Sequence, residues 1–281
     1  MKIIKQIDKI RAFSVEKKMQ GKIIGFVPTM GFLHEGHLSL IDKAKKESDI
    51  VIVSIFVNPT QFAPNEDLEK YPRDFESDRK ACELRGVDAI FYPDAKEYYY
   101  PDASTWVIEN ELSKGLCGAS RPEHFRGVGT VVIKLFNSVL PDIAIFGEKD
   151  YQQVAVIKRI VRDLNFPVKI LTGPIIRESD GLAMSSRNKY LSKTERENAL
   201  SINKSLFAIK KALIEKKITI KDALKIIEDN ITDSGGCIDY IKIVDAETLI
   251  EQNTFKNTIV IAVAVFFGKT RLIDNIIIER I

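Results

Sequence analysis

The sequence predicts an α/β fold, namely a Rossmann-like doubly wound parallel sheet with a smaller α+β C-terminal domain. Apolar runs of strand length alternate with amphipathic helical patterns as far as about residue 176, which is the order of βαβ units in a parallel sheet. The run at 49–57 is almost continuously apolar, as in strands that helices cover on both faces. After Ile176 the pattern changes to several helices and then three strands. We therefore expect a Rossmann-like domain over residues 1–176 and a second domain over residues 177–281.

Each element of the first domain is predicted from the spacing of its apolar residues. Ile3, Ile4, Ile7 and Ile10 begin a helical pattern over 3–20, which Gly21 ends. Apolar runs then predict core strands at 22–27, 49–57, 88–92, 142–146 and 168–171. Helical spacing predicts helices that include 38–44, 75–85, 131–140 and 151–164. The stretch at 104–110 alternates like a further strand, and 66–73 is interpreted as a loop or a short helix.

The second domain is predicted to be mainly helical from 193 to 230, with an interruption near 218. A Ser-Gly-Gly turn follows at 234–236. Three apolar runs, at 238–244, 258–267 and 271–279, then indicate the strands of a small sheet.

Composition limits the class of protein. The chain has 281 residues, 45% apolar and 29% charged, which is ordinary for a soluble globular protein with a full core. Its net charge of +3 is too small to indicate nucleic-acid binding. Cys82, Cys117 and Cys237 form no C-x-x-C pair, so we interpret them as buried or incidental thiols in a reducing compartment. We find no signal peptide and no run long enough to span a bilayer, and we expect a cytoplasmic protein.

The first buried strand leads into a histidine motif, Gly25 to Leu38, that contains His34-Glu35-Gly36-His37. A strand, a glycine-bearing turn and a helix start in this order favour phosphate binding, because the first N–H groups of a helix lack intrahelical partners and its dipole attracts an anion. Two of the three histidines of the chain lie here. The motif alone also fits two ordinary surface or core histidines, since it has neither the G-x-G-x-x-G spacing nor the P-loop pattern.

Further polar groups follow two other predicted strands. Gln61 lies in the segment directly after the strand at 49–57, where α/β proteins bind ligands, although this position also fits a plain turn residue. Gly147-Glu148-Lys149-Asp150 follows the strand at 142–146 and brings an ammonium group to the same rim. A lysine in this place is also often simply exposed to solvent.

Two loops complete the candidate site. Met184-Ser185-Ser186-Arg187-Asn188 offers two hydroxyls and a guanidinium, which suit phosphate oxygens. The glycine-containing segment 115–129, with Arg121, His124 and Arg126, is expected to be a mobile or ligand-covering loop.

Together, the histidine motif and the Ser-Ser-Arg loop resemble the HIGH and KMSKS signatures of the nucleotidyltransferase superfamily, which includes one group of aminoacyl-tRNA synthetases. Such sites bind ATP, expose its α-phosphorus and release pyrophosphate, so they need cationic and hydrogen-bonding groups at the triphosphate. Four segments narrow the resemblance to the pantothenate synthetase (pantoate–β-alanine ligase) family and keep its order and spacing: Pro28 to Gly31, Phe56 to Phe62, Gly147 to Gln153 and Met184 to Asn188. Glu123 departs from the family pattern, in which we expect glycine at this position.

The resemblance implies ATP-dependent condensation of (R)-pantoate with β-alanine through a pantoyl adenylate, with release of AMP and pyrophosphate. It implies ATP with Mg²⁺, small-molecule substrates, no nucleic-acid or membrane partner, and a homodimer. Residues 1–176 would bind nucleotide and pantoate, and residues 177–281 would form a lid domain that carries the Ser-Ser-Arg loop.

The resemblance also implies roles for individual residues. His37 would be the proton donor, with His34 and Lys149 also catalytic at the phosphates. Gln61 and Gln153 would hold pantoate, and Gln61 would also contact β-alanine. The ATP-binding residues would be Met30, Gly31, Phe32, Leu33, His34, Glu35, Gly36, His37, Gly147, Glu148, Lys149, Asp150, Ile176, Met184, Ser185, Ser186 and Arg187. The sequence assigns no Mg²⁺ ligand, although Asp74 and Asp78 lie near the expected phosphate rim.

Three other functions remain alternatives. A nucleotidyltransferase with a phosphorylated acceptor should offer basic partners where this chain has Gln61 and Gln153. An RNA-binding protein should carry a basic stripe, which this sequence lacks. A silent ATP-binding module would not need the complete set of His, Lys and Ser-Ser-Arg. An assay of AMP release, with pantoate and β-alanine each supplied or withheld, would separate these possibilities.

Overall fold

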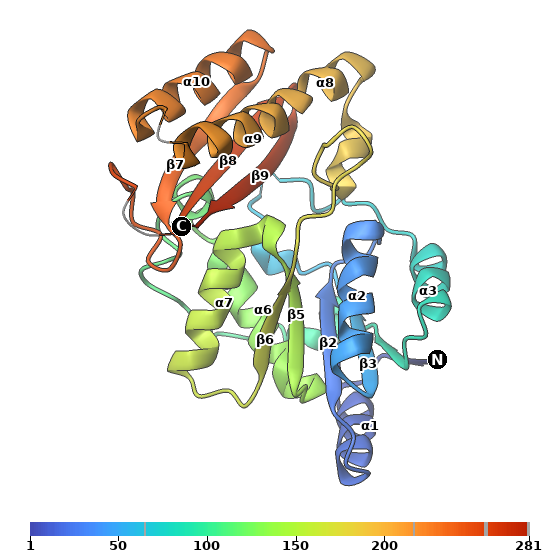
Figure 1. The fold of residues 1–281 in the computed structure, drawn as a ribbon. Helices are drawn as coiled ribbons and strands as arrows, with labels where there is room; N and C mark the ends of the chain where they lie inside the picture. The colour runs from blue at the N-terminus through green and yellow to red at the C-terminus, as the bar shows by residue number, and fades with distance from the viewer. Residues whose placement is uncertain (65, 216, 256–257, 280–281) are drawn as a thin grey trace. The chain divides into compact units, whose positions relative to one another are not determined.

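The chain divides into two compact units in the computed structural model, which describes residues 1–64, 66–215, 217–255 and 258–279 (Figure 1). Unit 1 comprises residues 1–111, 121–148 and 153–174. Unit 2 comprises residues 112–120, 149–152 and 175–281. The predicted fold class is confirmed, with a parallel α/β sheet in unit 1 and a small antiparallel sheet in unit 2.

Unit 1 is built on a six-stranded parallel sheet with the order β1-β4-β3-β2-β5-β6. Its strands are β1 (Lys2–Ile4), β2 (Ile24–Thr29), β3 (Ile50–Ile55), β4 (Ala89–Phe91), β5 (Ile143–Gly147) and β6 (Lys169–Gly173). Its helices are α1 (Ile7–Met19), α2 (Glu35–Glu47), α3 (Phe75–Leu84), α4 (Ala95–Tyr98), α6 (His124–Val139) and α7 (Tyr151–Asp163), the last of which begins with two residues of unit 2. A short 3₁₀ helix, η1 (Pro59–Gln61), follows β3.

Helices cover both faces of this sheet. Neighbouring residues of a strand point to opposite faces, and Phe26 and Val27 of β2 show the result. Val27 belongs to a buried cluster that includes Ile41 of α2, whereas the Phe26 ring lies 6.4 Å from that of Phe136 in α6, measured between centroids. Figure 1 shows α2 running along β2 and β3, which it contacts. The core strands are apolar throughout because both of their faces are covered.

The sequence prediction was wrong about where the first helix starts and about residues 104–110. Ile3 and Ile4 belong to β1, which pairs with β4, and the first helix begins only at Ile7. Residues 104–110, all of which the structure describes, form no strand. The N–H of Val107 donates instead to Thr130 Oγ1 of α6, at 3.0 Å, so this segment is anchored by a helix side chain.

The expected loop at 115–129 was also wrong, because it contains the short helix α5 (Cys117–Ser120) and the start of α6. Gly127 lies inside α6, where a Cβ atom would come 2.3 Å from the carbonyl oxygen of Thr60 in η1. Glycine is therefore needed for a close approach between helix and backbone, and it does not mark a mobile loop. Glu123 immediately precedes α6 and forms an ion pair with Arg126, one helical turn on.

Unit 2 contains an antiparallel sheet in the order β7-β8-β9. Its strands are β7 (Cys237–Asp245), β8 (Ile259–Phe267) and β9 (Thr270–Ile278), and its longer helices are α8 (Lys193–Asn198), α9 (Leu200–Ile214) and α10 (Ile220–Asp233). The 3₁₀ helix η3 (Ser186–Tyr190) precedes α8, and η2 (Glu148–Asp150) precedes α7. These strands and helices confirm the order that the sequence predicts.

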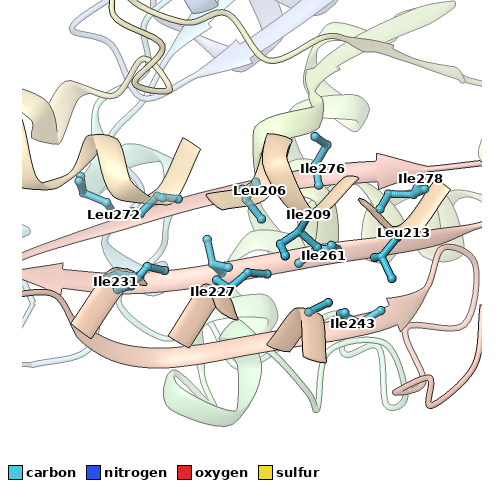
Figure 2. Close-up of a cluster of buried hydrophobic side chains, with 14 of the residues drawn as sticks. Leu206, Ile209, Leu213, Ile227, Ile231, Ile243, Ile261, Leu272, Ile276 and Ile278 are labelled. Carbon is cyan, nitrogen blue, oxygen red and sulfur yellow. The ribbon is translucent and has the colours of Figure 1, made fainter. Parts of the chain in front are cut away.

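The core of unit 2 lies between α9, α10 and one face of this sheet (Figure 2). Ile209 of α9 and Ile227 of α10 pack there with Ile261 of β8. Val260 and Ala262, the neighbours of Ile261, belong to a second buried cluster on the opposite face. The apolar run of β8 is therefore explained by burial on both faces. Within the part of the chain that is described, no helix has the length and hydropathy that a membrane span requires.

Candidate active site

The sheet of unit 1 contains a topological switch point between β2 and β5. The chain builds outward from β2 to β3 and β4, then returns to place β5 on the other side of β2. Ligands of open α/β sheets bind outside the carboxyl ends of the strands at such a point. The segment that follows β2 carries the predicted histidines, and Gly147-Glu148 lie where β5 ends.

The turn after β2 has a strained backbone. Gly31 and Phe32 have φ angles of +84° and +52°, in the left-handed region that residues other than glycine rarely adopt. Thr29 Oγ1 donates to the carbonyl of Ser54 (2.7 Å) and accepts from the N–H of Gly31 (3.1 Å). The turn is thereby tied to the end of β3.

A buried carboxylate, Asp78 of α3, holds the same turn from the other side. Its two oxygens accept the N–H groups of Phe32 (2.8 Å) and Leu33 (2.7 Å). The residue is 3% exposed, and burial raises the pKa of its carboxyl above the ordinary value, against the effect of these two hydrogen bonds. A Cβ at Gly31 would lie 2.9 Å from Asp78 Oδ2, so the close fit requires glycine. Asp78 is therefore a positioning residue, a role that spacing along the chain does not reveal.

The two histidines stand at the start of α2. His34 is the N-cap, and its Nδ1 accepts from the N–H of Gly36 (3.1 Å), while Nδ1 of His37 accepts from the N–H of His34 (3.3 Å). The ring centroids are 4.1 Å apart. Because an N–H can donate only to an unprotonated ring nitrogen, each neutral ring carries its proton on Nε2. In each neutral histidine the donor of the ring is therefore the Nε2–H group.

These contacts change one expectation about the helix start. The sequence suggested that unpaired backbone N–H groups would bind an anion there. In the structure the N–H groups of Phe32, Leu33, His34 and Gly36 all have acceptors within the protein. These hydrogen bonds fix the backbone that leads into α2. Glu35 is exposed, and its carboxylate pairs with Arg85 at 3.0 Å.

The structure brings Gln61 together with the histidine segment. Its Nε2 lies 2.9 Å from the sulfur of Met30, and its Oε1 accepts from Nδ2 of Asn58 at 3.1 Å. Asn58 is 1% exposed and also donates to the carbonyl of Gly127 at 3.1 Å. Asn58 thus fixes both η1 and the amide of Gln61. It lies within a quoted motif, but its role depends on a contact with α6 that spacing does not reveal.

Arg121 and His124 converge on the backbone of Gln61. The carbonyl oxygen of Gln61 accepts from Nη2 of Arg121 (3.2 Å) and lies 2.9 Å from Nδ1 of His124. Since a carbonyl only accepts, His124 donates from Nδ1 here. Arg121 is in turn held by Glu66, with an Nε–Oε1 distance of 2.7 Å. In this structure these residues hold η1 in place.

The two adjacent glutamines of α7 differ in their surroundings. Gln152 is 6% exposed, donates to the carbonyls of Leu112 (2.8 Å) and Gly115 (2.7 Å), and accepts from the N–H of Cys117 (2.9 Å). Gln153 is half-buried. Gln152 therefore has a structural role, which leaves Gln153 as the candidate for a ligand contact. Near the end of β5, the Glu148 carboxylate accepts from Thr172 Oγ1 at 2.7 Å.

Unit 2 holds the remaining predicted ATP-binding residues. The half-buried Lys149 has a pKa below the ordinary lysine value because burial disfavours its charge. Ile176 and Met184 face each other across a hairpin, where the N–H of Met184 donates to the carbonyl of Ile176 at 3.0 Å. Ser185 follows directly and caps η3 through its Oγ, which accepts from the N–H of Arg187 at 3.2 Å. Asp150 is exposed and Ser186 buried.

Neither aspartate near the expected phosphate rim is placed as a metal ligand. Asp78 is engaged by two amides, and Asp74 caps α3 by accepting from the N–H of Ser77 at 3.0 Å. Among the described residues no three histidine, cysteine or acidic side chains form a group that could hold a metal ion. A Mg²⁺ ion carried mainly by triphosphate oxygens and water requires no such group.

Comparison with known proteins identifies relatives over nearly the whole chain. A family model described as "Pantoate-beta-alanine ligase" matches residues 2–277. The pantothenate synthetase of Thermotoga petrophila is 54% identical over 282 residues, which cover 99% of this chain and 100% of that protein.

Solved structures are similar over the same length. The crystal structure of pantothenate synthetase from Thermus thermophilus has a TM-score of 0.92 at 41% identity and covers 98% of this chain and 99% of its own. The pantoate–β-alanine ligase of Francisella tularensis, complexed with β-γ ATP and β-alanine, has a TM-score of 0.82 at 38% identity. It covers 98% of this chain and 97% of its own.

Proposed function

The chain belongs to the pantoate–β-alanine ligase family, and from that premise we propose how its residues perform the reaction. The enzyme condenses pantoate with β-alanine at the expense of ATP, giving pantothenate. We propose that the reaction proceeds in two steps, through a pantoyl adenylate. The observation that carries the assignment of residues is the 2.9 Å contact between Gln61 Nε2 and Met30 Sδ, since it joins the proposed pantoate and ATP segments.

In the first step the carboxylate of pantoate attacks the α-phosphorus of ATP, and pyrophosphate leaves. Gln61 and Gln153 bind pantoate through neutral amides, which hold a carboxylate without suppressing its nucleophilicity as an arginine pair would. His34 and His37 donate from Nε2–H to phosphate oxygens, with His37 acting on the charge that develops as pyrophosphate departs. Lys149 supplies a positive charge for the same purpose.

In the second step the amine of β-alanine attacks the carbonyl of the adenylate, and AMP leaves. The proposed route needs no covalent bond to the protein, because positioning and charge stabilisation serve both steps. Gln61 remains in contact with the pantoyl group and meets β-alanine. Mg²⁺ enters with ATP and supplies further charge neutralisation at the triphosphate when it is bound.

We propose one set of ATP-binding residues. They are Met30 to His37, Gly147 to Asp150, Ile176 and Met184 to Arg187. We also propose residues 177–281 as a lid domain, a homodimer as the functional form and the cytoplasm as its location. Small-angle scattering with and without ATP plus pantoate tests the lid, and light scattering tests the dimer. The location is supported by three cysteines that form no disulfide, and fractionation of cells that produce the protein tests it.

Isotope exchange tests the proposed chemistry. Labelled pyrophosphate should enter ATP when pantoate is present and β-alanine is absent, since the first step is reversible while the adenylate stays bound. Lys149→Ala should reduce this exchange by on the order of 10²-fold or more, as for removal of one charge-stabilising donor. Exchange without pantoate would indicate an adenylylated enzyme and contradict the proposal. Exchange that requires β-alanine would contradict the two-step order.

A further inference from the structure

Strand β9 carries two buried polar neighbours, Asp274 and Asn275, each 4% exposed. The strand lies at an edge of the sheet of unit 2. Burial of polar groups is costly unless they find hydrogen-bond partners. Neighbouring strand residues point to opposite faces, so Asp274 and Asn275 reach different partners. One partner, Lys149, belongs to a segment that the proposed function assigns to ATP, and the other, Arg177, directly follows Ile176, which is also assigned to ATP.

Asn275 holds the backbone of Lys149. Its Nδ2 donates to the carbonyl oxygen of Lys149 at 2.9 Å. Lys149 is the middle residue of η2, a 3₁₀ helix of three residues. An element this short gains little stability from its own hydrogen bonds. A contact from a buried side chain on a strand therefore fixes where the lysine side chain begins.

Asp274 holds the hairpin that leads to Ser185. Its Oδ2 lies 2.6 Å from Nη1 of Arg177, and its Oδ1 lies 3.0 Å from Nη2. This two-pronged geometry is specific as well as strong. Nη1 of Arg177 also donates to the carbonyl of Gly181 at 3.2 Å, inside the turn of the hairpin, and Arg177 forms a β-bridge with Ala183. The ion pair therefore anchors both arms of the hairpin just before Ser185.

The same aspartate lines a pocket together with Lys149. Lys149, Ser185, Asn188 and Asp274 line one small pocket in unit 2, whose other lining residues are mostly apolar. The two segments that β9 anchors thus meet around this pocket.

We propose that Asp274 and Asn275 are positioning residues for adenylate formation, with Asn275 fixing the backbone of Lys149 and Asp274 fixing the Arg177 hairpin at the pocket that Lys149 also lines. This inference rests on the proposed function, because it adds no chemical step and acts through Lys149 and Ser185. It assigns a role in the reaction to the last strand of the chain.

The pH dependence of activity provides a measurement that a purely structural role of Asp274 would leave unchanged. Burial lowers the pKa of Lys149; the carboxylates of Asp150 and Asp274 act to raise it, and Arg187 acts to lower it. The reaction requires the charged ammonium, so activity is lost as pH rises through this pKa. Removing the charge of Asp274 should lower the pKa further and move that loss to lower pH.

The test uses two nearly isosteric variants of the full-length protein. Asn275→Leu removes the donor to Lys149 without adding charge, and pantoate-dependent pyrophosphate exchange should fall by on the order of 10²-fold, as for a small misplacement of a catalytic group. The NMR titration of the Lys149 side chain, assigned with Lys149→Arg, should stay unchanged in that variant. Asp274→Asn should move both the titration and the alkaline limb of the exchange to lower pH. Asn275→Ser, whose hydroxyl is attached directly to Cβ and falls short of the Lys149 carbonyl, should lower exchange in the same way as Asn275→Leu.

Asp239→Asn is the matched control. Asp239 of β7 pairs with Arg271 of β9 at 2.6 Å, and the two side chains are 16% and 18% exposed, respectively. Its loss should lower thermal stability while leaving the exchange rate and the Lys149 titration unchanged.

Three results would overturn the proposal. They are wild-type exchange in folded Asn275→Leu, an unmoved Lys149 titration in Asp274→Asn, and effects no different from those of Asp239→Asn. If Asp274→Asn does not fold, Asn275→Leu and Asn275→Ser decide the matter. If instead Lys149→Ala exchanges like wild type, the proposed function of Lys149 fails, while the NMR titration still reports on Asp274.

Discussion

Two buried carboxylates, one in each unit, hold segments of the candidate site with different partners. Asp78 accepts two neutral backbone N–H groups, from Phe32 and Leu33. Asp274 accepts two N–H groups of a guanidinium, that of Arg177. Burial outweighs the neutral donors and raises the pKa of Asp78, whereas an adjacent cation favours an ionised carboxylate. The histidine turn is thus held by two hydrogen bonds to a carboxyl whose charged form is disfavoured by burial. The hairpin before Ser185 is held by an ion pair.

The largest expected effect tests whether His37, in the segment held by Asp78, takes part in the reaction. His37→Ala should slow adenylate formation by roughly 10²-fold or more, the usual scale for a positioned acid. Folding should survive, because His37 is a half-buried residue at the start of α2. Single-turnover formation of the adenylate measures the effect, with circular dichroism as the check on folding. A wild-type rate in the mutant would remove His37 from the mechanism.

Substitution of Asp78, which anchors the histidine turn, should give the next largest effect. Asp78→Ala leaves the N–H groups of Phe32 and Leu33 without their acceptor, so the free energy of unfolding should fall by about 2–3 kcal/mol. The affinity for ATP should fall with it, because the histidine turn loses its fixed conformation. Asp74→Ala is the matched control, since Asp74 caps the same helix without touching the turn. It should cost about 1 kcal/mol of stability and leave ATP affinity, measured by calorimetry, unchanged.

The neighbouring glutamines of α7 separate binding from structure. Gln153→Ala should weaken pantoate binding by about 1.5–3 kcal/mol, the cost of a lost hydrogen bond to a charged group, and leave ATP binding nearly intact. Gln61→Ala should act in the same way. Gln152→Ala should instead reduce thermal stability, because three backbone groups lose their partner. If calorimetry shows that Gln153→Ala lowers ATP affinity instead, the two subsites are misassigned.

The smallest effect is a dependence of stability on pH. The folded-state pKa of Asp78 is raised, so the folded protein binds this proton more tightly than the unfolded chain. Its contribution to stability is present below the unfolded pKa and is lost as pH rises through the folded pKa. As pH rises through this acidic range, the unfolding free energy of wild type should therefore fall relative to that of Asp78→Asn. Denaturant titrations across that range measure it, and a constant difference would show that burial does not control this carboxyl.

The sequence by itself determined the α/β class, the order of most elements and the motifs that identify the family. These depend on local patterns, such as the apolar runs of β3 and β8, and on residues that lie close together in the chain. Its errors fell where a distant partner decides the outcome. The alternation at 104–110 predicted a strand, but Thr130 of α6 takes the Val107 N–H. The glycine of a supposed loop, Gly127, instead lets α6 pack against η1.

Only the tertiary structure decided how the motif residues are held. Asp78 reaches Phe32 across 46 positions of sequence, Asp274 reaches Arg177 across 97, and Asn275 reaches Lys149 across 126. No periodicity or spacing encodes such contacts, because they arise when separate elements pack and their buried polar groups must find partners. Asp274 and Asn275 are adjacent polar residues in a strand, β9, that is otherwise mainly apolar. Which partners they take is determined by the fold.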